Sequence, residues 1–227
     1  MTLLSEIYDI SNIKGNLRGK AKSGLIRPTV NQFFTSADWE AIEGDVYAND
    51  DFNTEILDTK RWLSTGSVSP IFNNGRVGGT ATLGNSFFIK HLGEIVGDCY
   101  ITVGTDIFIN STGYYGGIEL WDITNSTRIA AIFRNNNGIW TSINNNIYYA
   151  STNLDSPYLR IRRVGNMVYT DVASDGVSWG ADFYSHTAST NNAYVRLRIG
   201  VNQATSYTMW FNDLNFVNTV FSNKFKI

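Results

Sequence analysis

The sequence predicts an all-β sandwich, and the stretch 158–179 shows why. Residues 159–162 read LRIR, an apolar–basic alternation with the period of two that a half-buried strand requires. Residues 168–172 alternate again, while residues 165–166 (GN) and 174–176 (SDG) supply the Gly, Asn and Asp that tight turns favour. Three short strands joined by such turns form an antiparallel meander.

The same two signals divide the rest of the chain into short strands. Asn and Gly cluster at 73–75, 135–138 and 144–146, where we expect turns. Only 17% of the residues are charged, and Asn, Gly, Ser and Thr are abundant, which favours short strands over long helices. The further strands are expected at residues 68–72, 76–82, 86–91, 96–109, 114–122, 127–134, 138–143, 146–150, 178–184, 193–201 and 207–217.

Length, charge and cysteine content exclude several classes of protein. A chain of 227 residues suits one sandwich with an appendage. The net charge of −2 gives no overall field that favours nucleic acid or an anionic membrane, and no run approaches the roughly 20 apolar residues of a membrane span. Neither is therefore an expected partner. The one cysteine, Cys99, excludes an internal disulfide framework and is expected to be a buried structural thiol.

Residues 1–48 differ from the rest and are predicted to form an extended N-terminal arm. They lack the charged start, apolar centre and cleavage site of a signal peptide, so we expect a protein that is made in a cytoplasm and not exported. Their apolar residues show too little periodicity for a separate core, and the arm either packs on its own sandwich or anchors it to a neighbour. The expected assembly anchors are Lys14, Arg18, Lys20, Lys22, Arg27, Phe33, Phe34 and Trp39.

Three segments of the chain resemble a known family. Residues 50–62 contain D-D-F-N followed by L-D-T-x-x-W, and residues 210–217 (WFNDLNFV) resemble a closing F-D-D-V-x-V strand. Together with residues 158–179, they are similar to the concanavalin A-like lectin/glucanase superfamily, in its laminin-G-like branch.

The resemblance implies a jelly-roll β-sandwich over residues 49–220, preceded by the arm. Phe52 and Trp62 then belong to its core, because the family places the Phe and Trp of the opening motif there. Residues 221–227 are expected to be a tail that forms an extra strand or a contact segment.

Glycoside hydrolysis occurs in this family and needs two carboxylates that flank the scissile bond. The family's glucanases carry them on one strand as E-x-D-x-x-E, and the nearest match here is Glu119 with Asp122. A spacing of three places these two on opposite faces of a strand, and the second Glu is absent. We therefore predict a non-enzymatic protein with no catalytic residues. His91 and His186 are expected at solvated strand ends, outside any metal site or triad.

No metal site or cofactor is predicted, although calcium stays open. Legume-type lectins bind calcium through Asp and Asn on loops, and Asp50, Asp51 and Asn53 form a small cluster, as do Asp171 and Asp175. Each of these residues also fits an ordinary turn or strand start, and the dense spacing of a dedicated calcium loop is absent.

Sugar binding needs flat aromatic rings with polar side chains nearby. If Ile118 and Leu120 face the core, Trp121 shares the other face of its strand with Glu119. The alternative is that the aromatic residues are ordinary sandwich residues. The predicted glycan-binding residues, close to the Asn runs 135–137 and 144–146, are Tyr114, Tyr115, Trp121, Trp140, Tyr148 and Tyr149.

Four arginines alternate with apolar residues in two strands. Arg160 and Arg162 lie in one strand, and Arg196 and Arg198 lie in the other. If the two strands pair, the arginines form a basic stripe that suits an acidic partner or a glycan. The alternative is a solvated face whose charges are neutralised by neighbouring Asp and Glu.

These features leave three hypotheses for the function. The preferred one is a non-enzymatic structural component of a bacteriophage virion, either a capsid decoration or a tail protein, whose arm joins the sandwich to other virion proteins. The second is a lectin-like module that binds a glycan on the host surface, and the third is a glycoside hydrolase. Virion appendages are often symmetric, so a homo-oligomer, with a trimer as a guess, is an expected assembly.

Overall fold

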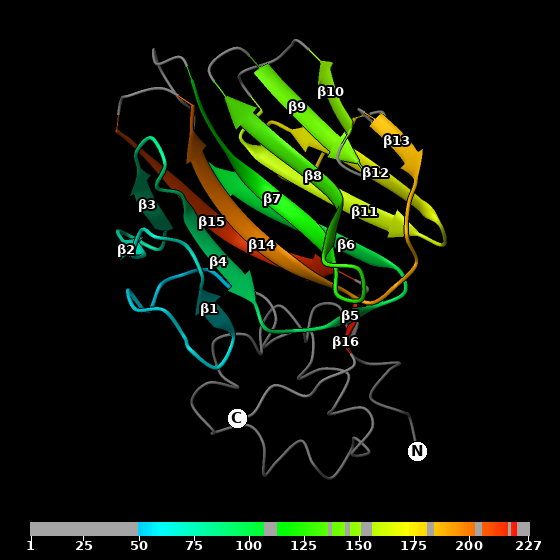
Figure 1. Ribbon diagram of the computed structural model, residues 1–227, viewed down its shortest axis with the longest axis horizontal. Helices are drawn as coiled ribbons and strands as arrows, with labels where there is room; N and C mark the ends of the chain where they lie inside the picture. The colour runs from blue at the N-terminus through cyan, green and yellow to red at the C-terminus, as the bar shows by residue number, and fades with distance from the viewer. Residues whose placement is uncertain are drawn as a thin grey trace, which may run out of the picture. The chain divides into compact units, whose positions relative to one another are not determined.

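The computed structural model describes residues 50–106, 113–135, 138–143, 146–150, 156–180, 184–202, 206–217 and 219–221. Within these residues every regular element is a β-strand, and none is a helix that could cross a membrane. The strands form two antiparallel sheets stacked as the layers of a jelly-roll sandwich (Figure 1).

The first sheet has nine strands among the described residues, in the order β1-β4-β14-β7-β8-β9-β10, with β5 on β14 and β16 on β5. Its long central strands pair over most of their length, so they form a continuous surface. In chain order the strands are β1 (Trp62–Ser64), β4 (Phe87–His91), β5 (Ile95–Val96), β7 (Tyr114–Asp122), β8 (Thr127–Asn135), β9 (Gly138–Ile143), β10 (Asn146–Ala150), β14 (Ala193–Val201) and β16 (Val220–Phe221).

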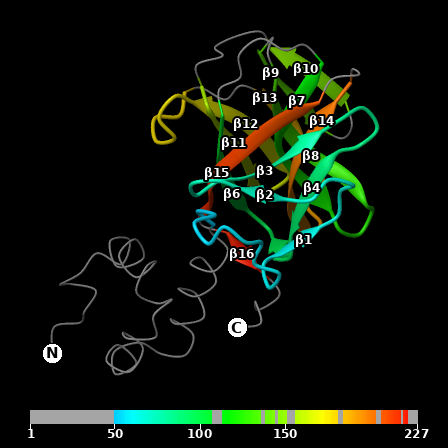
Figure 2. The same ribbon diagram turned by 90° about the vertical axis from the view of Figure 1, so that its left-hand side faces the viewer.

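The second sheet has seven described strands in the order β13-β12-β11-β6-β15-β3-β2. The consecutive strands β11, β12 and β13 pair antiparallel, so a meander forms as expected, but its third strand is Tyr184–Thr187 and not the predicted 178–184. Figure 2 looks at the side of the sandwich where β1, β2, β3 and β4 lie. The strands are β2 (Ile71–Phe72), β3 (Val77–Ala81), β6 (Cys99–Thr105), β11 (Tyr158–Val164), β12 (Met167–Ala173), β13 (Tyr184–Thr187) and β15 (Tyr207–Val217).

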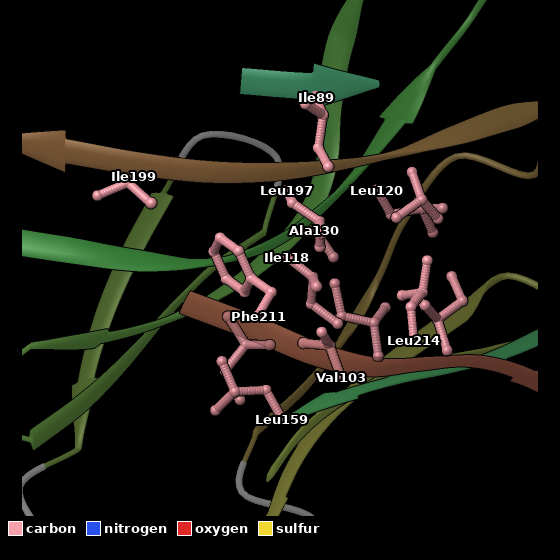
Figure 3. Packing of buried hydrophobic residues seen from close by; sticks show 14 of the residues in the cluster. Ile89, Val103, Ile118, Leu120, Ala130, Leu159, Leu197, Ile199, Phe211 and Leu214 are labelled. Carbon is pink, nitrogen blue, oxygen red and sulfur yellow. The ribbon is translucent and has the colours of Figure 1, made fainter. Parts of the chain in front are cut away.

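The core lies between the sheets and is made of the alternate apolar residues of each strand (Figure 3). Ile118 and Leu197 come from the first sheet, Val103 and Phe211 come from the second, and all four are fully buried. Burying each such side chain stabilises the fold by about 1.5–3 kcal/mol. The other residues of these strands must therefore face outward, which positions the site described below.

The aromatic residues of the opening motif, residues 50–62, pack in this core, as the family resemblance implied. Phe52 and Trp62 are 2% and 1% exposed, and their ring centroids lie 5.7 Å apart. The buried Asp50 accepts a hydrogen bond from Trp62 Nε1 at 2.8 Å, and its backbone pairs with Leu214. His91, expected at a solvated strand end, is instead fully buried, because β4 carries it between the two layers, where it packs against Trp62 at a centroid distance of 5.0 Å.

Three strand predictions are wrong in their extent. Of residues 68–72, only Ile71–Phe72 form a strand. Residues 96–109 were expected to form one strand, but Gly97, at φ 68°, separates β5 from β6. Residues 178–180 are not in a strand, and β13 begins only at Tyr184. The predicted arm 1–48 with all its anchor residues, and the end of the tail, 222–227, lie outside the described residues.

Candidate functional site

A charged and aromatic surface covers the outer side of the first sheet. In β7, Ile118 and Leu120 point into the core, so Glu119 and Trp121 point outward, as predicted. The partner strand β14 follows the same alternation, with Arg196 as one of its outward residues. We call this surface the outer face. Its described members from β4, β14, β7, β8 and β9 are Phe88, Lys90, Tyr194, Arg196, Arg198, Tyr115, Glu119, Trp121, Arg128, Phe133, Trp140 and Ser142.

The strand register sets these side chains in two neighbouring rows. Arg196 lies directly opposite Lys90 on one side and Glu119 on the other, which gives a charged row. In the next row Arg198 lies opposite Phe88, and further along Phe133 lies opposite Trp140. Residues directly opposite in antiparallel strands have Cβ atoms about 5 Å apart, so neighbours within each row are in contact. The two rows also touch, since the Arg196 guanidinium lies 4.5 Å from the ring centroid of Phe88.

Glu119 is the centre of the outer face and is 0% exposed. Its Oε2 atom accepts hydrogen bonds from Arg196 Nε at 2.5 Å and from Trp121 Nε1 at 3.0 Å. Its Oε1 atom accepts from Arg128 Nη1 and Arg198 Nη1, each at 3.3 Å. Three strands thus supply the donors for one carboxylate.

The arginines keep Glu119 ionised. Burial alone would raise the pKa of this carboxyl, but the charge and hydrogen bond of Arg196, followed by the charge of Arg198 and the bond from Trp121, outweigh burial and lower the pKa. Glu119 is therefore a carboxylate at neutral pH, and it lacks the raised pKa of a general acid.

Aromatic rings lie against the guanidinium groups of the outer face. The guanidinium of Arg196 lies 4.3 Å from the ring centroid of Trp121 and 4.5 Å from that of Phe88. Arg198 lies 5.0 Å from Tyr115 and 5.1 Å from Phe88. Cation–π contacts of this kind fix both arginines in place.

The structure gathers three of the six predicted glycan-binding residues. Tyr115, Trp121 and Trp140 are half-buried on the outer face, with 5.6 Å between the ring centroids of Tyr115 and Trp140. Tyr114 is 1% exposed and stacks on Tyr207 inside the sandwich, so it offers no ring to a ligand. The side chains of Tyr148 and Tyr149 on β10 lie outside the described part of the chain.

Sequence reasoning missed six members of the outer face. The sequence carries a signal for Phe88, Lys90 and Tyr194, because FFIKH over 87–91 and AYVRLRI over 193–199 alternate in the same way. The apolar run of β8 does not alternate, so it gives no such signal for Arg128 and Phe133. The alternation does not predict which strands become neighbours in the sheet. The missed residues are Phe88, Lys90, Arg128, Phe133, Ser142 and Tyr194.

The predicted basic stripe does not form, because β11 and β14 belong to different sheets. Arg160 and Arg162 lie on the outer side of the second sheet, where Asp171 Oδ2 accepts from their Nε atoms at 2.8 and 3.2 Å. The alternative expectation, that neighbouring carboxylates neutralise the arginines, is met on both sheets. Asp171 pairs with arginines of the second sheet and Glu119 with arginines of the first.

Asp122 is on the opposite face of β7 from Glu119, as the spacing predicted. It pairs in register with the core residue Ala193 and accepts hydrogen bonds from Asn125, Ser189 and Asn191. Burial opposes its ionisation, but these bonds together prevail and lower its pKa to about 2. The Asp122 carboxylate therefore connects the segments that carry Asn125, Ser189 and Asn191. It cannot act with Glu119 on one glycosidic bond.

The acidic clusters considered for calcium are engaged in local structure. Asp50 binds Trp62, Asp51 Oδ1 accepts the backbone N–H of Asn53, and Asp175 Oδ1 accepts those of Val177 and Ser178. Among the described residues no group of three or more His, Cys, Asp or Glu is placed to hold a metal ion.

Comparison with known proteins supports the fold. No family model matches the sequence, and no curated protein matches it. A legume lectin-like domain from Entamoeba histolytica aligns over 73% of this chain and 95% of its own, with a TM-score of 0.55 and 14% identity. A non-specific endo-β-1,3(4)-glucanase from family GH16 aligns over 74% and 88%, with a TM-score of 0.56 and 12% identity.

A second enzyme, a transglycosylase, shares the fold. The Crh5 transglycosylase aligns over 75% of this chain and 83% of its own, with a TM-score of 0.55 and 13% identity. This chain has the sandwich fold of concanavalin A-like lectins and GH16 glucanases. At such low identity the likeness extends to the fold alone.

The prediction of a non-enzymatic protein is wrong, because the fold that this chain has is shared by enzymes. Several of the matching structures are glycoside hydrolases or transglycosylases, including an endo-β-galactosidase from Clostridium perfringens, and lectin-like domains share the same fold. The comparisons give no support to the laminin-G-like branch or to a bacteriophage virion origin.

Proposed function

We propose that the protein binds glycans through the outer face of its first sheet. The observation that carries this proposal is the placement of Trp121, Tyr115 and Trp140, half-buried on one continuous sheet surface beside the arginine guanidiniums. Rings of this kind stack on the apolar faces of sugars, and guanidinium N–H groups donate to sugar oxygens. The shared fold with lectin-like domains supports the proposal.

The test is a binding screen of the purified protein against a panel of bacterial and plant polysaccharides. Trp140→Ala and Trp121→Ala should each weaken binding about fivefold or more, because one stacked ring contributes about 1 kcal/mol. Trp179→Ala is the matched control, since Trp179 is half-buried against Arg160 on the second sheet. Absence of glycan binding by the wild type refutes the proposal, as does binding that the Trp140 and Trp121 changes leave unaltered.

Chemistry on the bound glycan is a second candidate function, because glycoside hydrolases and transglycosylases share this fold. A two-carboxylate mechanism needs a second group across the bond. Glu119 is the one carboxylate among the described members of the outer face and is fully buried beneath the arginines, so both catalytic carboxylates would have to come from elsewhere in the chain. The test is release of new reducing ends from a polysaccharide that the purified protein binds, and no release refutes this candidate.

The role in a virion stays a proposal from the sequence. The basic and aromatic arm, residues 1–48, would join the sandwich to an assembly. Deletion of residues 1–45 should leave a folded glycan-binding domain that no longer enters its particle, and retained incorporation would contradict this role.

A further inference from the structure

Cations outnumber anions on the outer face. Lys90, Arg128, Arg196 and Arg198 face a single carboxylate, Glu119, among the described side chains of this surface. Three positive charges are therefore uncompensated there, although the chain as a whole carries a net charge of −2. An excess of one sign on a surface attracts ligands of the other sign.

The outer face also has more hydrogen-bond donors than acceptors. The three arginines and the Trp121 indole carry about sixteen N–H groups, whereas the Glu119 carboxylate offers about four acceptor sites. Ser142 Oγ accepts one further bond, from Arg128 Nη2 at 2.8 Å. Among the described residues, the buried Nε atoms of Arg128 and Arg198 have no hydrogen-bond partner. The surface is short of oxygen acceptors.

The cations are fixed and partly open to solvent. Side chains of Arg128, Arg196 and Arg198 are 12%, 18% and 23% exposed, while Glu119 beneath them is 0% exposed. A ligand above the sheet thus meets guanidinium edges and not the carboxylate. The Nζ atom of Lys90, in the charged row, adds a cation 3.8 Å from the ring centroid of Tyr194.

We infer that the glycan bound by the outer face is anionic and carries carboxylate or sulfate groups that bind Lys90 and the exposed edges of Arg196 and Arg198. Acidic oxygens supply the acceptors that this surface lacks, and guanidinium groups bind carboxylate and sulfate oxygens in pairs. Neutral sugars, by contrast, would leave three cations without a counter-charge. This inference rests on the glycan binding proposed above and names the class of the ligand.

The test compares oligosaccharides that differ only in charge. Galacturonate oligomers are measured against their methyl esters, and sulfated laminari-oligosaccharides against neutral ones, by isothermal titration calorimetry with the full chain. We expect at least one charged member to bind about tenfold or more tightly than its neutral partner. The first pair detects a requirement for carboxylate and the second a requirement for sulfate. Binding should also weaken as NaCl is raised from about 50 to about 500 mM.

Variants assign the effect to the outer face. Lys90→Gln and Arg198→Gln should each weaken binding of the charged oligomer about tenfold, and Lys90→Gln should leave binding of a neutral one within about twofold. Arg162→Gln is the matched control. Arg162 is 19% exposed, pairs with Asp171 and lies 4.6 Å from the ring centroid of Tyr169, but it belongs to the second sheet. Thermal melting confirms that each variant is folded.

The outcomes separate this inference from the proposed function. Charged and neutral oligomers of equal affinity overturn the anionic ligand and leave glycan binding intact. Charged oligomers that respond to Arg162→Gln and not to Arg198→Gln move the site to the second sheet and overturn the inference. No binding of any glycan overturns the proposed function, and the inference falls with it.

Discussion

Glu119→Gln should destabilise the sandwich at neutral pH, although glutamine has nearly the same shape. The variant leaves Arg128, Arg196 and Arg198 without the buried carboxylate that accepts a hydrogen bond from each of them. Removing one partner of a buried ion pair costs about 3–5 kcal/mol. The arginines are 12–23% exposed and regain some hydration, so we expect a loss of about 3 kcal/mol in the free energy of unfolding.

The effect should disappear in acid. The pKa of Glu119 is lowered in the folded protein, while an unfolded glutamate titrates at about 4.3. The stabilisation from its charge is therefore complete above about pH 4.3 and is lost as the pH falls through the folded pKa. Below that pKa the wild type also carries a neutral side chain at 119, so it should be no more stable than the variant. Other carboxylates titrate in both proteins, and their contributions cancel in the difference.

Urea denaturation of both proteins at pH 7 and in acid measures this difference. A loss of about 3 kcal/mol corresponds to a decrease of about 6–12 °C in the midpoint of thermal unfolding. Glu55→Gln is the control, because Glu55 is exposed and should change stability by less than about 0.5 kcal/mol. If the difference at pH 7 is below about 1 kcal/mol, or if it persists unchanged in acid, the ion pairs of Glu119 do not stabilise the fold as argued.

Two substitutions and one labelling experiment test other parts of the sandwich. Asp50→Ala should lower the free energy of unfolding by about 3 kcal/mol in urea titrations followed by tryptophan fluorescence, because it removes the buried acceptor of Trp62 Nε1. Gly79→Ala should cost about 1–3 kcal/mol in thermal melts, since its new Cβ would lie 2.5 Å from the Phe87 ring. Burial raises the pKa of Cys99 to about 11, so at pH 8 the native thiol should react with a thiol reagent at least about 100-fold more slowly than the unfolded chain.

Each of these three has its own contradicting result. Gly180→Ala, which introduces a Cβ with no heavy atom within 4 Å, should be nearly neutral, and an equal loss in both glycine variants would refute the steric argument. An Asp50→Ala protein as stable as the wild type would show that the indole finds another acceptor. Rapid labelling of native Cys99 would mean that β6 opens readily.

The local features of the fold were predictable from the sequence because they depend on residues close together in the chain. The alternation of 114–122 placed Trp121 with Glu119 and placed Asp122 on the other side, and the structure confirms both. The family resemblance of the opening motif, and not its periodicity, placed Phe52 and Trp62 in the core, where both are buried. A period of two is a local property, so it needs no knowledge of the partner strand.

The composition of the site was not predictable in the same way, because it depends on which strands pair. Four arginines in two alternating strands suggested one basic stripe, yet β11 and β14 lie in different sheets and each pair has its own carboxylate. Tyr114 and Tyr115 are adjacent and chemically alike, but only Tyr115 points outward. Lys90 entered the site only through its register with Arg196.

By itself, then, the sequence determined the all-β class, the position of most strands and the face on which each side chain of a strand lies, since hydrophobic burial imposes a period of two on a strand. The tertiary structure decided which faces meet. By pairing β14 with β7, it brought Arg196 and Arg198 onto Glu119 from a segment far along the chain, where they join Arg128 from the neighbouring strand β8. That convergence made a charged, ring-lined surface, because long-range strand register, and not local pattern, sets the neighbours of a side chain.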